Sequence, residues 1–203
     1  GENGSGKSTL INLITGLLVP SRGNVFFDGI NIHNNLEQFR SHIGYVPQDT
    51  MLLNESIESN ITFCRNAVSE HALEEVLHIC EVDVIMKTNS MSIDTVIGEK
   101  GNKLSGGQKQ KIALSRALYR KPKLLIIDEG TSNIDSDTEE RILKRVKSVY
   151  PDMTIIIVSH RLSTVRKADR IIVLDKSQVA ENGEYAQLLD NGTVFRKIFA
   201  NQI

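Results

Sequence analysis

The chain opens with Gly1-Glu2-Asn3-Gly4-Ser5-Gly6-Lys7-Ser8-Thr9, a stretch that fits the pattern G-x-x-x-x-G-K-[ST]. Glycines at these positions let backbone N–H groups curl around phosphate oxygens, and the following helix adds the positive end of its dipole. In such a loop Lys7 reaches the β- and γ-phosphates, and the Ser8 hydroxyl is a ligand of Mg²⁺. The stretch therefore predicts a site for a nucleoside triphosphate with Mg²⁺. A Gly- and Ser-rich turn before a helix is the alternative.

The loop leads into a helix predicted over Lys7–Leu18, which Pro20 and Gly23 end. A phosphate loop needs a strand in front of it, and the chain begins at the first glycine of the loop rather than at a Met. We therefore expect the chain to be a fragment that lacks the first strands of its domain.

Composition bounds the possible functions. A chain of 203 residues can form one domain, or one domain with a small inserted lobe. Its 24 basic and 25 acidic residues nearly balance, which gives no indication of a nucleic-acid or anionic-membrane partner. No apolar run approaches the roughly 20 residues that cross a bilayer, so we expect this stretch to be soluble. Cys64 and Cys80 lack disulfide or metal-site spacing, which predicts two small buried hydrophobes.

Strands and helices alternate along most of the chain, which predicts an α/β fold with a parallel sheet covered on both faces. The expected strands are Val25–Phe27, Ile43–Val46, Leu124–Ile127, Thr154–Val158 and Arg170–Leu174. The expected later helices are Ser105–Tyr119, Ser136–Val149 with a Ser136/Glu139 capping box, Leu162–Lys167, Glu184–Leu189 and Val194–Ala200. Residues 54–103 show a helical pattern, with a helix start at Ser69 and no strand signal, and are predicted to form an inserted helical lobe.

A second glycine pair occurs in Leu104-Ser105-Gly106-Gly107-Gln108, at the start of a predicted helix. Ser105 and Gln108 alone fit a capping box. A plain cap gains nothing from glycine in the first turn, however, because each glycine there costs about 0.8–1 kcal/mol relative to alanine. Two in succession indicate that something approaches the backbone closely, and at a helix N-terminus that is most often an anion.

L-S-G-G-Q is the signature motif of the ABC ATPases, and nearly the whole chain resembles this family, with its motifs in the family order. The resemblance implies a P-loop NTPase fold, with a RecA-like core from residues 1–53 and 104–203 and a helical subdomain at 54–103. It also implies that the signature of one subunit closes over ATP held by the phosphate loop of another. Leu104–Gln108 would then contact the γ-phosphate in trans.

Two acids follow the predicted strand Leu124–Ile127, at the carboxyl end where open α/β sheets bind ligands. By resemblance, Asp128 is the Walker B aspartate that holds Mg²⁺, and Glu129 is the catalytic carboxylate that polarises the attacking water. His160 follows the next strand and matches the switch histidine that hydrogen-bonds the γ-phosphate. A strand that runs into an acidic loop, and a structural histidine, are the alternatives.

Two further positions match the family. Gln48 fits the Q-loop glutamine, which reaches Mg²⁺ and the water, and Asp135 lies in the D-loop, Ser132–Asp135, which crosses to the opposite subunit. Ordinary surface loops are the alternative for both. Gly130 stands where this family usually has Ala or Pro, which predicts a slightly looser D-loop.

The exporter branch of the family is indicated by two stretches. Thr95–Gly101 resembles the x-loop of exporters, and Asp49–Ile61 resembles the segment that grips the coupling helices of the membrane domain. We expect an apolar docking patch there, drawn from Met51, Leu52, Leu53 and Ile57. The resemblance implies a head-to-tail homo- or heterodimer, a transmembrane partner bound through Gln48–Ile61, and a place on the cytoplasmic face of a plasma or inner membrane.

Three rival functions are weaker. ATPases that organise chromosomes insert hundreds of residues between the Q-loop and the signature, whereas the spacing here is 57 residues (105 − 48). A GTPase needs N-K-x-D, and Asn102-Lys103-Leu104-Ser105 lacks the aspartate. A regulatory module without turnover usually loses the Glu, the His or a signature glycine, all of which this chain keeps. The sequence therefore predicts ATP hydrolysis that powers export, and the cargo is left open.

Overall fold

The computed structural model describes residues 1–63 and 68–202. Two compact units make up the chain, and each is described by itself. The loop unit consists of Gly1–Arg40 together with the chain from Ser159 onward, and the sheet unit is Ser41–Val158. Cys64 lies outside the described residues.

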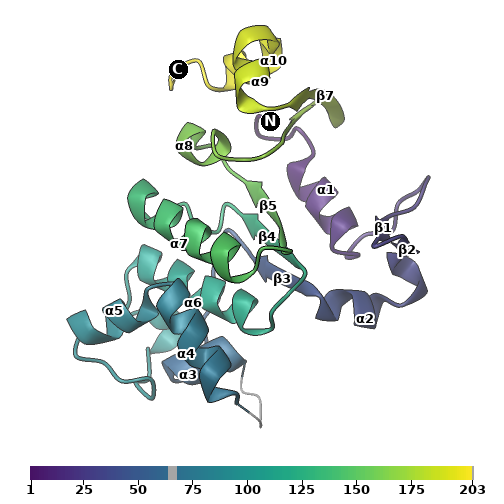
Figure 1. Cartoon of the computed structure of the whole chain (residues 1–203). Helices are drawn as coiled ribbons and strands as arrows, with labels where there is room; N and C mark the ends of the chain where they lie inside the picture. The colour runs from purple at the N-terminus through teal and green to yellow at the C-terminus, as the bar shows by residue number, and fades with distance from the viewer. Residues whose placement is uncertain (64–67, 203) are drawn as a thin grey trace. The chain divides into compact units, whose positions relative to one another are not determined.

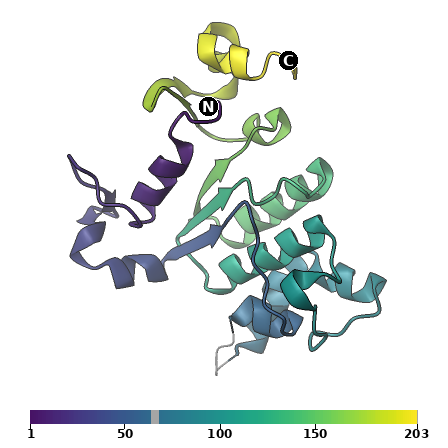
Figure 2. The ribbon, with the colours of Figure 1, turned by 180° about the vertical axis from the view of Figure 1, so that it is seen from behind.

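The sheet unit is built on three parallel strands in the order β3 (Ile43–Val46), β4 (Leu124–Asp128) and β5 (Thr154–Val158) (Figure 1). Figure 2 shows the same strands side by side from behind. The register pairs Val46 with Ile127 and Asp128 with Val158. Because parallel strands end at one edge, the residues that follow β3 and β4 are brought to the same edge of the sheet.

Five α-helices accompany this sheet in the described part of the unit. They are α3 (Ile57–Thr62), α4 (Glu70–Ile79), α5 (Val82–Thr88), α6 (Gly106–Tyr119) and α7 (Ser136–Val149), with a short 3₁₀ turn, η2 (Glu99–Gly101). Apolar residues of all five helices and of β4 form one core cluster, in which α3, α4 and α5 gather beside α6 (Figure 1). Cys80 belongs to this cluster, and burial raises the pKa of its thiol to about 12. The prediction of a small buried hydrophobe is therefore confirmed for Cys80.

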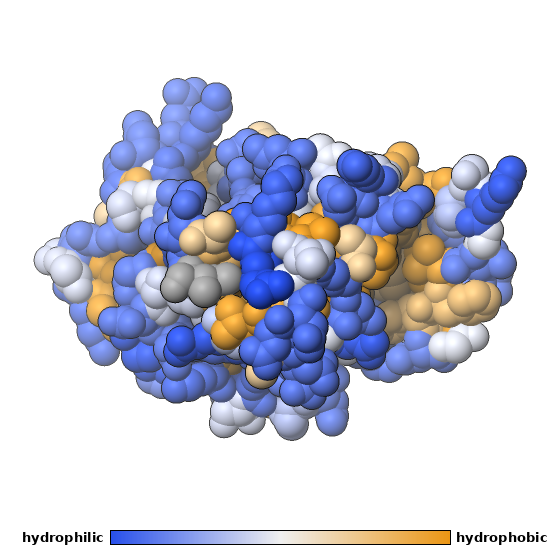
Figure 3. Space-filling view, turned by 90° about the horizontal axis from the view of Figure 1, so that it is seen from above, coloured by the Kyte–Doolittle hydropathy of each residue, from blue (hydrophilic) through white to orange (hydrophobic). Residues whose placement is uncertain are grey.

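The loop unit carries shorter elements. They are α1 (Lys7–Ile14), β1 (Phe26–Phe27), β2 (Ile30–Asn31), η1 (Ile32–Asn34), α2 (Leu36–Ser41), α8 (Leu162–Val165), β6 (Ile171–Asp175), β7 (Gln178–Gly183), α9 (Tyr185–Asn191) and α10 (Thr193–Ile198). A small core joins β6 to the last two helices through Ile171, Val173, Leu188, Phe195 and Phe199. Apolar side chains also reach the surface, where orange areas interrupt the polar face in Figure 3.

Three sequence predictions need correction. The helix after the phosphate loop ends at Ile14 rather than Leu18, because Gly16 takes a left-handed conformation (φ 68°) and Leu17 N–H turns back to the carbonyl of Asn12. The cap of α7 is Asp135 rather than Ser136, since the Asp135 side chain accepts from the N–H of Thr138.

The third correction concerns the strand predicted at residues 170–174. This strand is β6, and it pairs with β7 as an antiparallel hairpin, which the alternation of strands and helices did not predict. The strands β2 and β7 were not expected. Both belong to short antiparallel pairs, in which a tight turn rather than a long apolar run brings the strands together.

No helix in the described ranges, 1–63 and 68–202, has both the length and the apolar character that a bilayer crossing needs.

Candidate functional site

The phosphate loop lies at the start of the loop unit and leads directly into α1. Gly4 and Gly6 have φ values of 77° and 96°, a region that side chains with a Cβ rarely adopt. Lys7 Nζ donates to the carbonyls of Gly1 and Glu2, at 2.7 and 2.9 Å, and so lies across the loop. The backbone is thus folded into a tight cradle with an ammonium group over it.

The residues of this loop fit a triphosphate. The first backbone N–H groups of a helix have no partner within it, and α1 places them beside Lys7. Ser8 and Thr9 are exposed, as are Asn3 and Gly4, so the hydroxyl predicted to bind Mg²⁺ is accessible. Ser5 Oγ is buried without a hydrogen-bond partner in the described structure, which leaves a polar atom for a ligand.

The rear of the loop is supported by the β6–β7 hairpin. Ser177 N–H donates to the Ser5 carbonyl at 3.2 Å, and a Cβ on Gly1 would come within 2.3 Å of the Leu174 carbonyl. Glycine at position 1 is therefore required by close packing against β6. The short sequence pattern did not reveal this support.

His160 belongs to the loop unit and follows Ser159, whose Oγ accepts from the N–H of Arg161. The Gln202 side chain brackets this segment, since its Nε2 donates to the His160 carbonyl and its Oε1 accepts from Leu162 N–H. These contacts fix the backbone on either side of the histidine. The role of its side chain at the γ-phosphate stays a prediction.

The carboxylates of the sheet unit come together with the Q-loop glutamine. Gln48 Nε2 donates to Glu129 Oε2 at 2.9 Å, where β3 and β4 end. Asp128 lies at the last position of β4 and accepts a hydrogen bond of 3.3 Å from the Tyr45 hydroxyl. Two predicted site residues, Gln48 and Glu129, are thus hydrogen-bonded to each other. Asp128 has a partner that the sequence did not predict, Tyr45.

Glu129 is held in an unusual backbone conformation. Its φ is 52°, which is uncommon for a residue other than glycine, and its N–H donates to the Val158 carbonyl of β5. Gly130 follows, and a Cβ there would lie 2.5 Å from Val46 Cγ1. A glycine at position 130 lets the chain pass closely over β3, which is a packing reason for the departure from Ala or Pro.

Tyr45 supports a testable prediction. Burial, with the charge of Asp128 beside it, raises the pKa of Tyr45, so its hydroxyl stays protonated and donates. Side chains that orient metal ligands typically change metal affinity 10–100-fold. Because this hydrogen bond is long and exposed, we expect Tyr45→Phe to raise the Mg²⁺ concentration for half-maximal turnover by about threefold to tenfold, at or below the lower end of that range.

The measurement is a Mg²⁺ titration at saturating ATP, with the thermal midpoint as the measure of folding. Tyr119→Phe, which removes a hydroxyl that accepts from Ser69 N–H, is the matched control and should leave the Mg²⁺ dependence unchanged. If Tyr45→Phe and the original protein have the same Mg²⁺ dependence, Tyr45 does not orient Asp128 for Mg²⁺ binding.

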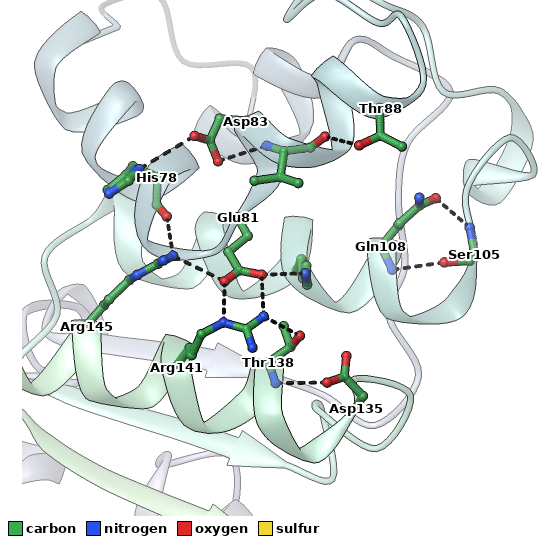
Figure 4. Close-up of polar contacts among 12 residues, drawn as sticks. His78, Glu81, Asp83, Thr88, Ser105, Gln108, Asp135, Thr138, Arg141 and Arg145 are labelled. Carbon is green, nitrogen blue, oxygen red and sulfur yellow. Dashed lines mark hydrogen bonds and ion pairs between the residues drawn. The ribbon is translucent and has the colours of Figure 1, made fainter.

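The signature is a capped helix start, as Figure 4 shows. Ser105 Oγ accepts from Gln108 N–H at 3.3 Å, and Gln108 Oε1 accepts from Ser105 N–H at 2.9 Å, so the predicted capping box is present. Ser105 and Gly106 are exposed and Leu104 is buried below them. The first-turn amides of α6 therefore face outward without helical partners.

The signature helix also holds the D-loop. Gln110, which is buried, donates from Nε2 to Ser132 Oγ at 3.2 Å and accepts from Asn133 N–H at 2.8 Å. A Cβ on Gly107 would lie 2.7 Å from the Asn133 carbonyl oxygen. The second signature glycine thus has a local packing role in addition to the predicted ligand role.

Comparison with known proteins identifies the family of the chain. Residues 1–132 match the ABC transporter family. The chain belongs to this family. A structure of a bacterial Atm1-family ABC exporter with ATP bound superposes on 100% of this ABC domain with a TM-score of 0.93 and 34% identity, and the domain covers 36% of that chain. The predicted P-loop NTPase fold is confirmed.

Curated relatives of the ABC domain are longer proteins. The mitochondrial iron-sulfur clusters transporter of Danio rerio is 39% identical over 205 residues, which cover 100% of this chain and 28% of the relative. The exotoxin translocation ATP-binding protein PaxB of Pasteurella aerogenes is 41% identical over 196 residues, which cover 94% and 27%. The chain thus spans less than a third of the length of either relative.

The segment predicted to bind a membrane domain, Asp49–Ile61, is called the docking segment here and is partly exposed. Met51 is 78% exposed and Leu53 is 41% exposed, whereas Leu52 and Ile57 are buried in the core. Of the four apolar residues considered for a docking patch, two are therefore available. Phe63 is a further exposed apolar residue, with the Arg116 guanidinium 5.3 Å from its ring centroid.

Hydrogen bonds give the docking segment a defined shape. Asn60, fully buried, accepts from Leu53 N–H and donates to the Leu53 carbonyl, and Arg116 of α6 donates to the carbonyls of Met51 and Asn60. The x-loop runs alongside, since Ile97 N–H donates to the Glu55 carbonyl. The signature helix therefore holds the segment that was predicted to face the membrane domain.

Sequence reasoning missed Tyr45, Gln110 and Arg116 as supports of the site. Their partners are 83, 22–23 and 56–65 residues away, and no local pattern identifies such contacts. The available signal was helical spacing: Gln110 lies between two lysines but three and four residues before Ala113 and Leu114, which places it on the buried side of α6.

Proposed function

We propose that this ABC domain binds and hydrolyses ATP and that hydrolysis powers export through a transmembrane partner. ATPases make up this family, and the domain keeps each motif that turnover needs. The observation that carries the proposal is the hydrogen bond between Gln48 and Glu129 beside Asp128 at the carboxyl end of parallel strands. The carboxylates of Asp128 and Glu129 and the amide of Gln48 thus lie at the edge of the sheet where α/β folds bind ligands.

Each site residue has a separate role in phosphoryl transfer in this proposal. Lys7 and the loop amides neutralise the phosphates, and binding would exchange the contacts of Lys7 with its own loop for contacts with phosphate oxygens. Glu129 orients the attacking water and accepts its proton, while Gln48 fixes the direction of the carboxylate. His160 donates a hydrogen bond to the γ-phosphate. Positioning and charge stabilisation account for catalysis, because the transition state is loose.

Magnesium is expected to be held by Ser8, Gln48 and Asp128, together with phosphate oxygens, and to supply positive charge at the developing negative charge. Mg²⁺ in such sites typically uses one or two carboxylates and keeps several waters. The described residues contain no cluster of three His, Cys, Asp or Glu side chains suited to a metal, which agrees with this sparse ligand set.

Two copies or partners act as a head-to-tail dimer in this proposal. The start of α6 supports it, because the N–H groups of Gly106 and Gly107 suit an anion supplied from outside, whereas the N–H of Ser105 is already bonded to Gln108 Oε1. Asp135 already caps α7, and this hydrogen bond to Thr138 N–H lowers the pKa of Asp135, so its carboxylate stays ionised. A D-loop anchored in this way can reach an opposite subunit without losing its own helix cap.

The transmembrane partner binds through Gln48–Ile61 in this proposal, with Met51 and Leu53 as apolar contacts. Arg116 and Asn60 hold this segment to the signature helix, so a shift of α6 on ATP binding would move the docking surface. The cargoes in the relatives' names differ, and cargo choice belongs to the membrane domain. In an intact exporter the ABC domain lies on the cytoplasmic side of the membrane.

The test is ATP turnover by the intact protein that contains this chain. Lys7→Met should abolish binding of a fluorescent ATP analogue and lower phosphate release by about 10²–10³-fold, the loss typical for a group that stabilises transition-state charge. Lys87→Met, at an exposed lysine of α5, is the matched control and should keep full activity. Undiminished ATP binding and turnover in Lys7→Met would overturn the proposed function.

A further inference from the structure

The turn between α4 and α5 contains a charged residue in a strained conformation. Glu81 has φ 57°, in the left-handed region, and its side chain is only 10% exposed. Such a conformation costs free energy in a residue other than glycine, and burial of a carboxylate adds to that cost. Something must therefore compensate at this turn.

Three cations from two helices surround this carboxylate, and Figure 4 labels two of them, Arg141 and Arg145. Lys111 Nζ of α6 lies 3.1 Å from Glu81 Oε2, and Arg141 Nε of α7 lies 3.1 Å from Oε1. Arg145 Nη1, also of α7, lies 3.4 Å from Oε1 and donates to the His78 carbonyl at the end of α4. One residue of the turn therefore joins α4, α6 and α7.

Glu81 is ionised at neutral pH. Burial alone would raise its pKa, but hydrogen bonds from Arg141 and Lys111 outweigh burial and hold the pKa below its ordinary value. The carboxylate is nearly buried, although Arg141 and Arg145 are 52% and 37% exposed, and loss of a cation leaves this buried charge with less compensation. The three helices are thus linked by charge as well as by apolar packing.

Both helices that Glu81 contacts begin at a proposed contact with the opposite subunit. The helix α6, with Lys111, starts at the signature, Ser105–Gly107. The helix α7 starts at the D-loop, and Arg141 Nη2 donates to Thr138 Oγ1, next to the cap that Asp135 makes on Thr138 N–H. Figure 4 shows this continuous path from Glu81 to Asp135.

We propose that Glu81 is a positioning residue that fixes the signature helix and the D-loop helix relative to each other, so that both reach the nucleotide of the opposite subunit together. This inference rests on the proposed function, since it concerns the trans contact within it. Glu81 touches neither ATP nor water in the reaction. Its effect is carried by Lys111 of α6 on one side and by Arg141 and Arg145 of α7 on the other.

The experiment removes the cations of one helix at a time in the intact protein. Because Arg145 still pairs Glu81 with α7 when Arg141 is replaced, the α7 contacts are removed by the variant Arg141→Met/Arg145→Met. Lys111→Met and Arg141→Met/Arg145→Met should each raise the ATP concentration for half-maximal turnover by about threefold to tenfold, a range typical for residues that modulate coupling without touching a ligand. The maximal rate and the binding of a fluorescent ATP analogue to the phosphate loop should stay near the original values. Lys144→Met, which removes the exposed partner of Glu140 on α7, is the matched control and should change none of these quantities.

The triple variant Lys111→Met/Arg141→Met/Arg145→Met completes the test. If Glu81 links the two helices, loss of the contacts on either side breaks the link, so the triple variant should be no worse than the more affected of the other two variants, and the effects are non-additive. The proposal is wrong if the fold-changes in the ATP concentration for half-maximal turnover multiply when the variants are combined. It is also wrong if the variants lower the thermal midpoint and leave the ATP dependence unchanged, because Glu81 would then have only a structural role. Absence of ATP turnover in the original protein would instead contradict the proposed function itself.

Discussion

Glu129→Gln is expected to lower steady-state ATP turnover by about 10²–10⁴-fold, the usual contribution of a general base, while ATP still binds. The amide keeps an oxygen that can accept from Gln48, so the local geometry is retained. It loses the negative charge and the basicity that polarise the attacking water. ATP should therefore bind, close the dimer and remain there.

Phosphate release measures the expected loss of turnover, and binding of a fluorescent ATP analogue measures whether ATP still binds. Glu140→Gln is a matched control, because Glu140 lies on α7 and pairs with Lys144 at the surface. It should leave turnover within about twofold, as expected for an exposed ion pair. Turnover near the original rate in Glu129→Gln would remove Glu129 from its assigned role, and loss of ATP binding would indicate a structural role instead.

Local sequence signals predicted the sheet unit well. The observed bounds of β3 and β5, Ile43–Val46 and Thr154–Val158, are those predicted, and α6 begins at the Ser105 cap. Each of these elements has a strong local cause, either an apolar run that suits a buried strand or a side chain that caps its own helix. The capping residue of α7 was harder to predict, because Asp135 and Ser136 are adjacent and both residue types are good helix caps.

The cap of α7 was decided by a contact that spans eight residues, beyond the four residues of a capping pattern. Glu139, which completed the predicted capping box with Ser136, is buried and accepts from the Thr131 hydroxyl instead. The Asp135 side chain then caps Thr138 N–H. The choice between the two capping residues therefore depends on Thr131, which precedes the D-loop, and a capping pattern of four residues does not include it.

In the candidate site, too, residues of local motifs were predicted and residues that act through distant contacts were not. Motif residues were predictable because phosphate chemistry demands a particular residue type at a particular spacing, as in Gly6, Lys7 and Ser8. Their supports were not, since Gln110 and Arg116 act through buried hydrogen bonds to segments far along the chain. Gly130 shows a further limit, because its reason is the closeness of Val46 on a neighbouring strand.

Subunit mixing gives the second large expected effect, because it tests whether the signature acts in trans. The signature variant is Gly106→Gln, since a side chain at position 106 would meet only the exposed side chain of Asn133, which can shift. A side chain at Gly107 would instead meet the Asn133 carbonyl at 2.7 Å and disturb the D-loop of its own subunit. Gly106→Gln should therefore block the approach of a nucleotide with the least change within its own subunit.

Lys7→Met and Gly106→Gln should each be inactive alone, because every composite site then contains one damaged half. Mixed in equal amounts and allowed to exchange, about half of the dimers pair unlike subunits, and each such dimer keeps one intact site, so activity should reach up to about a quarter of the original. Two copies of Lys7→Met mixed with each other serve as the control and should stay inactive. A silent mixture, after exchange has been verified by labelled subunits, would contradict the trans contact. Full activity of Gly106→Gln alone would contradict any role of the signature at the phosphate, since α6 would then present its free amides to nothing that turnover requires.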